Sequence, residues 1–388
     1  MSTKVGTAQR HDSALKHVTG QALYIDDIPE PPGTLHGALV LSTVACGRLK
    51  KLGLAAVATS PGVVAVLAAD DVPGRNDVAP IGQGEPLFAM DRVDYAGQPL
   101  AMVVAESLDA ARAAAERAVV EIEEEEPILD IATALAKKAY VQAPATLLRG
   151  DPENALDRAP HRLTAEFSVG GQEHFYLEGQ IAFALPGEDG DIVVHSSTQH
   201  PTEVQHICAR LLGCDFNRIT AVVRRLGGGF GGKESNASWV AGAAAVAANH
   251  TGRPVKLRLP REIDMIATGK RHGFDYRYTV GFDDEGRVLA LDAELAADAG
   301  WSLDCFGTFG MGGALLQKVN RDTFSFAQKA SWGVVDGEAR AICKRPQGDP
   351  GKASKAGRIA SHRHRGDGRW CTAIEGTLDA GQIGRAHV

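Results

Sequence analysis

The chain has 388 residues, of which 44% are apolar and 23% charged, a composition typical of globular proteins with more than one domain. The net charge of −7 argues against nucleic acid as a partner. No apolar run reaches the ~18 residues of a membrane span, and the N-terminus lacks the apolar core of a signal peptide, so we expect a cytoplasmic protein. The six cysteines include no Cys-x-x-Cys pair, so their spacing predicts neither a zinc site nor an iron–sulfur cluster.

The first part of the chain mixes short strands with a helix. Three apolar runs have the length of strands, and they are followed by an alanine-rich helix pattern at 108–117 and an alternating edge-strand pattern at 118–125. The three runs occupy residues 35–42, 62–68 and 100–105. We therefore predict a small α/β domain over residues 17–136, preceded by an N-terminal arm of residues 1–16.

The next part contains more strands than helices. A turn-rich linker over residues 137–162 leads into a second domain, predicted over residues 163–304. Asp283 to Gly286 separates two of its strands and predicts a hairpin turn. The predicted strands are 163–169, 181–185, 192–196, 219–225, 255–259, 276–282 and 288–296, and the predicted helices are 201–212 and 238–249. Hairpins beside strand–helix joints indicate an α+β fold class.

A glycine-rich loop is the strongest functional signal in the chain. Five glycines occupy six positions at residues 227–232 (GGGFGG), between a strand pattern at 218–226 and a helix pattern at 238–248. Bare backbone amides at the start of a helix favour an anionic ligand, and glycine lets a planar one approach closely. We therefore expect a cofactor site at this loop.

Motif comparison leaves three other interpretations of the loop. It has the spacing of a phosphate-binding loop, but Glu234 stands where that loop needs a Ser or Thr. Gly227, Gly229 and Gly232 match the dinucleotide fingerprint G-x-G-x-x-G, but the acidic residue expected about 20 positions further on is missing from residues 249–253, and the next acid is Glu262. A tight strand-to-helix turn without any ligand is the third interpretation.

Four stretches taken together resemble a known family. They are residues 171–180 (GQEHFYLEGQ), 196–201 (SSTQHP), 226–234 (LGGGFGGKE) and 268–272 (TGKRH). In this order and at this spacing they resemble the molybdenum-binding subunit of bacterial xanthine dehydrogenase, of the aldehyde oxidase/xanthine dehydrogenase family, over about residues 5–304. The resemblance implies that residues 17–136 form the family's α/β hammerhead domain and residues 163–304 the N-terminal part of its molybdopterin-binding domain.

The resemblance also implies a reaction and its cofactors. The family's enzyme hydroxylates hypoxanthine and xanthine toward urate with oxygen from water, using a molybdenum–molybdopterin cofactor. Electrons pass to a partner subunit that carries 2Fe-2S and FAD, and the complete enzyme is expected to be a dimer of heterodimers. The general base and a substrate-orienting arginine lie in the family's C-terminal portion, so we assign no catalytic residue here and expect this chain to be inactive alone.

Five residues are carried over as site residues. Without the family, Gln199 would be a helix-start residue, Phe230 a core residue and Glu234 a helix-start acid. The resemblance instead implies that Gln199 hydrogen-bonds an oxygen ligand of the molybdenum. It implies that Gly229, Phe230 and Gly231 approach the cofactor, and that Glu234 binds the purine. No side chain is expected to ligate the metal directly.

Two further polar groups have more than one interpretation. Glu173, His174, Tyr176 and Glu178 could serve acid–base chemistry or a metal, but we favour a buried polar network that holds the glycine loop. The basic residues 270–272 could bind phosphate of the pterin or the neighbouring subunit, or form an exposed turn.

The last part of the chain does not continue the resemblance. Residues 306–388 hold 13 Lys and Arg against 7 Asp and Glu, which could form a disordered arm that binds nucleic acid. We instead expect residues 305–388 to be the product of a reading-frame error, with the last six residues resembling a translated sequencing adapter. Alternative functions are an aldehyde oxidase-like molybdenum hydroxylase, an NAD-binding oxidoreductase built on the loop glycines, and a non-catalytic assembly product.

Overall fold

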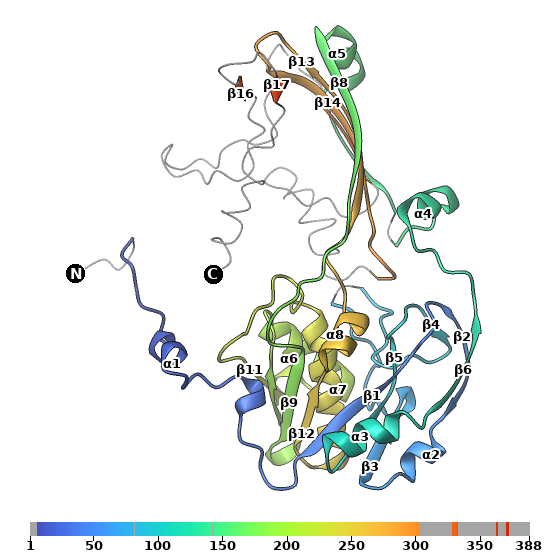
Figure 1. The fold of residues 1–388 in the computed structure, drawn as a ribbon, viewed down its shortest axis with the longest axis vertical. Coiled ribbons are helices and arrows are strands. Elements are labelled where there is room, and N and C mark those ends of the chain that lie inside the picture. Colours follow the sequence, from blue (N-terminus) through green and yellow to red (C-terminus); the bar gives the residue numbers. More distant parts are fainter. Residues whose placement is uncertain are drawn as a thin grey trace. The chain divides into compact units, whose positions relative to one another are not determined.

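The computed structural model describes residues 6–80, 82–141, 143–302, 328–332, 362–363 and 370–371. The chain forms two compact units (Figure 1). Unit 1 comprises Met1–Glu126 and His174–Gly269, and unit 2 comprises Pro127–Glu173 and Lys270–Val388. In the described part of the chain, no helix has the length and apolar character needed to cross a membrane.

The main sheet of unit 1 combines strands from both of its chain segments. In spatial order its described strands are β11 (Ile219–Val222), β10 (Ile192–Ser196), β9 (Ile181–Pro186), β12 (Val255–Arg258), β1 (Leu35–Leu41), β5 (Pro99–Ala105) and β3 (Val63–Leu67). The two segments meet where β1 pairs in parallel with β12, with Leu35 opposite Val255. Every residue of β5 is buried, as expected for an apolar strand covered on both faces. Unit 1 therefore spans parts of both segments that the sequence predicts as separate domains.

The rest of the N-terminal segment forms a smaller sheet and short helices. The small sheet has the order β4 (Arg92–Val93), β2 (Gly47–Gly53) and β6 (Val119–Glu124). The helices are α1 (Ala14–Val18), α2 (Ala55–Ala58) and α3 (Leu108–Ala115), and 3-10 turns cover Ile25–Asp27 and Ala69–Asp71. The alternating sequence of β6 gives alternating burial along half of the strand, because successive side chains point to opposite faces.

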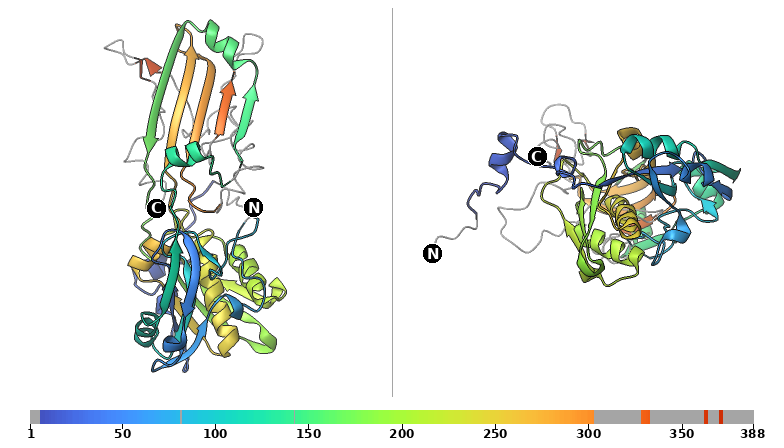
Figure 2. Two further views of the ribbon diagram at one scale, coloured as in Figure 1. Left: turned by 90° about the vertical axis from the view of Figure 1, so that its right-hand side faces the viewer. Right: turned by 90° about the horizontal axis from the view of Figure 1, so that it is seen from below.

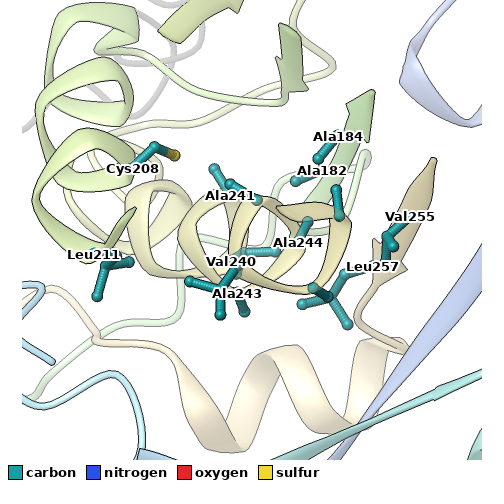
Figure 3. Packing of buried hydrophobic residues seen from close by; sticks show 14 of the residues in the cluster. Ala182, Ala184, Cys208, Leu211, Val240, Ala241, Ala243, Ala244, Val255 and Leu257 are labelled. Carbon is teal, nitrogen blue, oxygen red and sulfur yellow. The ribbon is translucent and has the colours of Figure 1, made fainter. Parts of the chain in front are cut away.

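Helix α7 (Asn236–Thr251) is the centre of the hydrophobic core of unit 1. It packs against α6 (Pro201–Leu212) and against β9 and β12, and Figure 3 shows the side chains that surround it. All residues from Ala237 to Ala248 are buried, so the helix is apolar on every side. Its small side chains let the neighbours approach closely: a β-carbon on Gly242 would overlap Leu211 of α6.

The remaining elements of unit 1 are short. Helix α8 (Arg261–Ala267) follows β12, and 3-10 turns cover Glu188–Gly190 and Phe216–Arg218. The chain between β11 and α7 contains the glycine-rich loop. The main sheet and α7 thus fix the two ends of that loop.

Unit 2 is built around a second sheet, whose described strands lie side by side in Figure 2. Their order is β7 (Ala145–Arg149), β15 (Gln328–Trp332), β14 (Val288–Ala297), β13 (Phe274–Phe282) and β8 (His161–Val169). The hairpin predicted at Asp283 to Gly286 joins β13 to β14, and Gly286 N–H donates to Asp283 O at 2.9 Å. Helices α4 (Ile131–Lys137) and α5 (Pro152–Arg158) precede β8, and β16 (His362–Arg363) pairs with β17 (Trp370–Cys371).

The predicted fold class is confirmed, since strands and helices mix in both units. The helix predicted at 201–212 has those bounds in the structure. The strand predicted from the pattern at 218–226 is shorter in the structure, because β11 ends at Val222 and the chain then enters the loop. The predicted tail, residues 305–388, lies almost wholly outside the described residues.

Candidate functional site

The glycine-rich loop, residues 227–232, has an unusual backbone. The φ angles are 95° at Gly228, 52° at Phe230 and 94° at Gly231, all in the left-handed region. Such a conformation costs a non-glycine residue free energy. Phe230 nevertheless adopts it, and the residue is 49% exposed. The crown of the loop therefore presents an aromatic ring to the solvent side at some conformational cost.

The other glycines of the loop are required by close packing within the protein. A β-carbon at three of them would overlap a neighbouring side chain. The pairs are Gly227 with Glu178, Gly229 with Gln199, and Gly232 with His174. The loop is thus glycine-rich partly because protein side chains pack directly against its backbone.

Gln199 is held by the loop through both its main chain and its side chain. Its Oε1 accepts hydrogen bonds from the N–H of Gly231 at 2.9 Å and of Lys233 at 3.2 Å. Its own N–H donates to Lys233 O at 2.9 Å. Because Oε1 faces these two donors, the amide orientation is fixed and Nε2 is directed away from them. Within the described residues this exposed Nε2 has no hydrogen-bond partner.

Glu178 anchors the start of the loop. Its Oε2 accepts from the N–H of Gly227 at 2.8 Å and from Ser197 Oγ at 2.7 Å. The main-chain N–H of Glu178 also donates to Gly227 O at 3.0 Å. The side chain is only 12% exposed. A carboxylate that accepts a backbone N–H in a buried place forms a strong, charge-assisted hydrogen bond.

Lys233 anchors the end of the loop and is fully buried. Its Nζ donates to Glu178 O and to Ser197 Oγ, each at 2.5 Å, and lies 3.7 Å from Glu178 Oε2. The ammonium also sits 4.5 Å from the centre of the Tyr176 ring, in cation–π geometry. Burial lowers the pKa of Lys233 to about 8, although Glu178 and Asp264 act against that shift.

A second buried group supports the loop next to Lys233. Asp264 is 1% exposed and accepts from Tyr176 Oη at 2.7 Å and from the N–H of Gln180 at 2.9 Å. Gln180 Nε2 in turn donates to Gly232 O at 2.9 Å. Burial and the neighbouring Asp264 raise the pKa of Tyr176 above its usual range. Tyr176 therefore stays a neutral donor to the carboxylate at ordinary pH.

The structure brings most of the predicted site residues together. Gln199, Gly229 and Gly231 are in direct contact, and Phe230 lies exposed beside them. The N–H of Gly231 is used to hold Gln199, so it is not open to a ligand. Glu234 is half-buried, two residues before α7, and forms no hydrogen bond or ion pair within the described residues.

The predicted polar network is largely confirmed. Tyr176 and Glu178 belong to it, and His174 stacks against the Tyr176 ring with 6.3 Å between ring centres. Glu173 belongs to unit 2, where it pairs with Lys270 at 3.0 Å. One member of the predicted basic turn is thus neutralised by one of the acids.

Sequence reasoning missed three members of this network. Lys233 and Ser197 lie inside two of the motif stretches but were given no role of their own, while Asp264 lies outside all four stretches. A lysine next to a tightly packed glycine loop could have been expected to be buried, since its neighbours leave it little exposed surface. Asp264 lies 31 residues further along the chain from Lys233, so only the tertiary fold brings it here.

The sheet order argues against the dinucleotide interpretation of the loop. A dinucleotide fold joins neighbouring parallel strands through the helix that follows the glycine turn. Here the strands before and after α7 are β11 and β12, and β10 and β9 lie between them. The described residues also contain no group of three His, Cys, Asp or Glu side chains placed to hold a metal ion.

Family models match three parts of the chain. Residues 19–126 match the aldehyde oxidase and xanthine dehydrogenase a/b hammerhead domain. Residues 136–320 match the molybdopterin cofactor-binding domain. Residues 296–373 match the nicotinate phosphoribosyltransferase family, overlapping the end of the second match. Most of the third match lies outside the described residues.

Curated relatives are xanthine dehydrogenases. The chain is 40% identical over 295 residues to xanthine dehydrogenase of Dictyostelium discoideum, which covers 76% of this chain and 22% of the relative. It is 42% identical over 306 residues to that of Oryza sativa subsp. japonica, covering 78% of this chain and 22% of the relative. The chain thus spans about a fifth of the length of these relatives.

Solved structures with the same fold include two oxidoreductases. Aldehyde oxidoreductase from Desulfovibrio gigas superposes with a TM-score of 0.69 at 26% identity, covering 83% of this chain and 37% of that one. Quinoline 2-oxidoreductase from Pseudomonas putida 86 superposes with a TM-score of 0.69 at 21% identity, covering 86% of this chain and 44% of that one. The second likeness concerns the fold alone.

Proposed function

Because the chain belongs to the aldehyde oxidase and xanthine dehydrogenase family, we propose that it is a molybdopterin-binding part of a xanthine dehydrogenase. The proposed reaction is the hydroxylation of hypoxanthine and xanthine toward urate, with oxygen from water. The proposed electron acceptors are 2Fe-2S and FAD groups on a partner subunit, in a dimer of heterodimers.

One observation carries this proposal: the clamped carboxamide of Gln199 beside the crown of the glycine loop. Two loop amides hold its Oε1, so its Nε2 is a donor pair of fixed direction that the protein itself leaves unused. A preorganised donor of this kind suits a ligand rich in acceptors and loses little entropy on binding. The exposed ring of Phe230 lies on the same loop.

The residues present fit a molybdenum–molybdopterin cofactor. Gln199 would donate to it from Nε2, and Gly229, Phe230 and Gly231 would face it across the loop. When bound, the cofactor supplies the two-electron oxidation and oxygen transfer that no side chain of the described site can supply. The protein's part is to hold the acceptor side of the cofactor against a fixed donor and to leave room for a flat substrate next to it.

Glu234 is the proposed substrate-binding residue. It is half-buried, and within the described residues no cation or donor compensates its carboxylate. A carboxylate in such a place can hydrogen-bond the N–H groups of a purine, and a site built this way rejects analogues that leave it unpaired. The xanthine dehydrogenase relatives favour a purine over the aldehyde of the Desulfovibrio gigas structure, because they are more similar in sequence.

The test uses a complete xanthine dehydrogenase in which residues 19–302 replace the matching segment of the Dictyostelium discoideum relative. We expect this enzyme to retain molybdenum and to oxidise xanthine. Glu234→Ala should lower xanthine turnover at least about a hundredfold, because the purine then loses its charged hydrogen-bond partner, while the molybdenum content stays unchanged. Glu262→Ala, which removes an exposed acid of α8, is the control and should change neither. Equal loss of metal and turnover in Glu234→Ala would contradict the assigned role.

A further inference from the structure

Lys233 contacts the site through its main chain and the protein interior through its side chain. Its main-chain N–H donates to Gln199 Oε1, and its carbonyl accepts from the N–H of Gln199 at 2.9 Å and from Thr198 Oγ1 at 3.1 Å. Its side chain runs the opposite way, into the protein, and is fully buried. One residue thus joins the Gln199 turn to the protein interior.

The buried end of Lys233 connects three chain segments. Nζ donates to Glu178 O and Ser197 Oγ and lies over the Tyr176 ring. Glu178 then holds the N–H of Gly227. The segments that contain Glu178, Ser197 and the glycine loop are therefore tied at a single ammonium group. Each hydrogen bond of this group is charge-assisted and poorly accessible to water, which makes it stronger than an exposed one.

The orientation of Gln199 depends on this tie. The carboxamide would lose its fixed direction if the N–H groups of Gly231 and Lys233 moved away from Oε1. Both N–H groups belong to the stretch that the Lys233 side chain holds down. The Gln199 side chain also packs directly against Gly229, where a β-carbon would overlap it.

We propose that Lys233 is a positioning residue: its buried ammonium fixes the end of the glycine loop, and the loop in turn directs the amino group of Gln199 toward the bound ligand. The identity of that ligand rests on the function proposed above. The positioning itself can be measured on the 388-residue chain without any cofactor, so failure of the proposed function and failure of this inference give different results.

The test compares two buried lysines of unit 1. Lys233→Met removes the ammonium and keeps most of the side-chain volume. Lys256→Met is the matched control, because Lys256 is 6% exposed and pairs with Asp26 and Glu30. Amide-resolved hydrogen exchange follows the N–H of Gly231. We expect exchange about tenfold faster or more in Lys233→Met and a change within about twofold in Lys256→Met. No change in Lys233→Met, or an equal change in both variants, would overturn the proposal.

A second variant tests the same proposal if Lys233→Met does not fold. Ser197→Ala removes one acceptor of Nζ and one donor to Glu178 Oε2, and leaves the contacts between Lys233 and Gln199 in place. It should accelerate exchange of the Gly231 N–H about threefold, in line with the partial loss of the support that holds the end of the loop. Unchanged exchange in a folded Ser197→Ala protein would overturn the proposal.

A pH profile separates positioning from general stability. If the Gly231 N–H opens only together with Lys233, opening returns the ammonium to water and takes up a proton above about pH 8. Protection of this N–H, corrected for the intrinsic rate, should then rise from about pH 8 to 9.5 in the wild type and stay flat in Lys233→Met. A flat profile in the folded wild type, together with unchanged exchange in Lys233→Met, would refute the proposal.

Discussion

Two largely buried regions of unit 1 are held together by opposite means. The core around α7 is made of alanines, valines and leucines that pack on every side of the helix. The glycine loop lies a few residues before α7 in the chain. It is supported by the polar residues Tyr176, Glu178, Gln180, Lys233 and Asp264. Apart from Ser238, the small and aliphatic side chains of the first region need no hydrogen-bond partner, whereas the second region depends on each donor having its acceptor.

The difference shows what each region can specify. Apolar packing tolerates small shifts of a side chain, because dispersion and burial depend weakly on direction. A buried hydrogen-bond network tolerates few such shifts. An unsatisfied buried group costs more free energy than a satisfied hydrogen bond contributes. The loop backbone therefore has one arrangement, which is what a cofactor site needs, while α7 provides the stable base behind it.

The largest expected effect comes from the centre of the polar support. Asp264→Ala removes the acceptor of Tyr176 Oη and of the Gln180 N–H in a place that water does not reach. We expect a loss of about 3–5 kcal/mol of unfolding free energy, measured by urea denaturation. Asp12→Ala is the control and should cost less than about 0.5 kcal/mol, because Asp12 is almost fully exposed. A loss below about 1 kcal/mol for Asp264→Ala would mean that the network adds little.

Much of the fold could be predicted from the sequence, and the reasons are local. Helix 201–212 begins with Pro201 and is followed directly by Gly213, so its bounds follow from backbone chemistry alone. The strand predicted at 192–196 contains a β-branched run, the strand predicted at 255–259 alternates apolar and basic residues, and both occur within a residue of those bounds. The pairing of β1 with β12 could not be predicted, because it joins residues that lie more than 200 positions apart.

The candidate site was predictable only in part, for a similar reason. Gln199 and the loop were found through motifs, and the structure places them in contact. Glu178 and Tyr176 were expected in a polar network from their composition, which the structure confirms. Asp264 lies outside the four motif stretches, and only the packing of α8 brings it to Tyr176.

The second largest effect is a difference between the two buried lysines in how their contributions to stability change with pH. Burial lowers the pKa of Lys233 from 10.5 to about 8. The unfolded chain therefore binds more protons at Lys233 between these values, and the contribution of Lys233 to stability rises with pH across about pH 8 to 10. Burial also lowers the pKa of Lys256, but Asp26 and Glu30 more than offset this and raise it. The contribution of Lys256 is then constant in this window and is lost only above it.

The measurement is the difference in unfolding free energy between wild type and Lys233→Met. This difference should change by on the order of 2–3 kcal/mol in favour of the wild type from pH 8 to 10. Taking the difference removes the opposite effect of Cys208, whose thiol pKa is raised to about 12 by burial. The same difference for Lys256→Met should stay constant. A parallel rise for both lysines would mean that the pKa of Lys233 is not set by its own surroundings.

The smallest effect tests whether the apolar region is as tolerant as the comparison claims. Gly242→Ala adds a methyl group that meets Leu211 of α6, which we expect to cost about 1–2 kcal/mol, because close-packed helices must then separate slightly. Leu211→Ala creates the room, so in that background the same change should stabilise by up to about 1 kcal/mol through the better helix propensity of alanine. A double-mutant cycle measures this reversal of sign. If Gly242→Ala is equally costly in both backgrounds, the contact with Leu211 is not what limits the packing, and the core around α7 is more rigid than its composition suggests. The loop would then owe its single arrangement to the helix behind it as much as to its own hydrogen bonds.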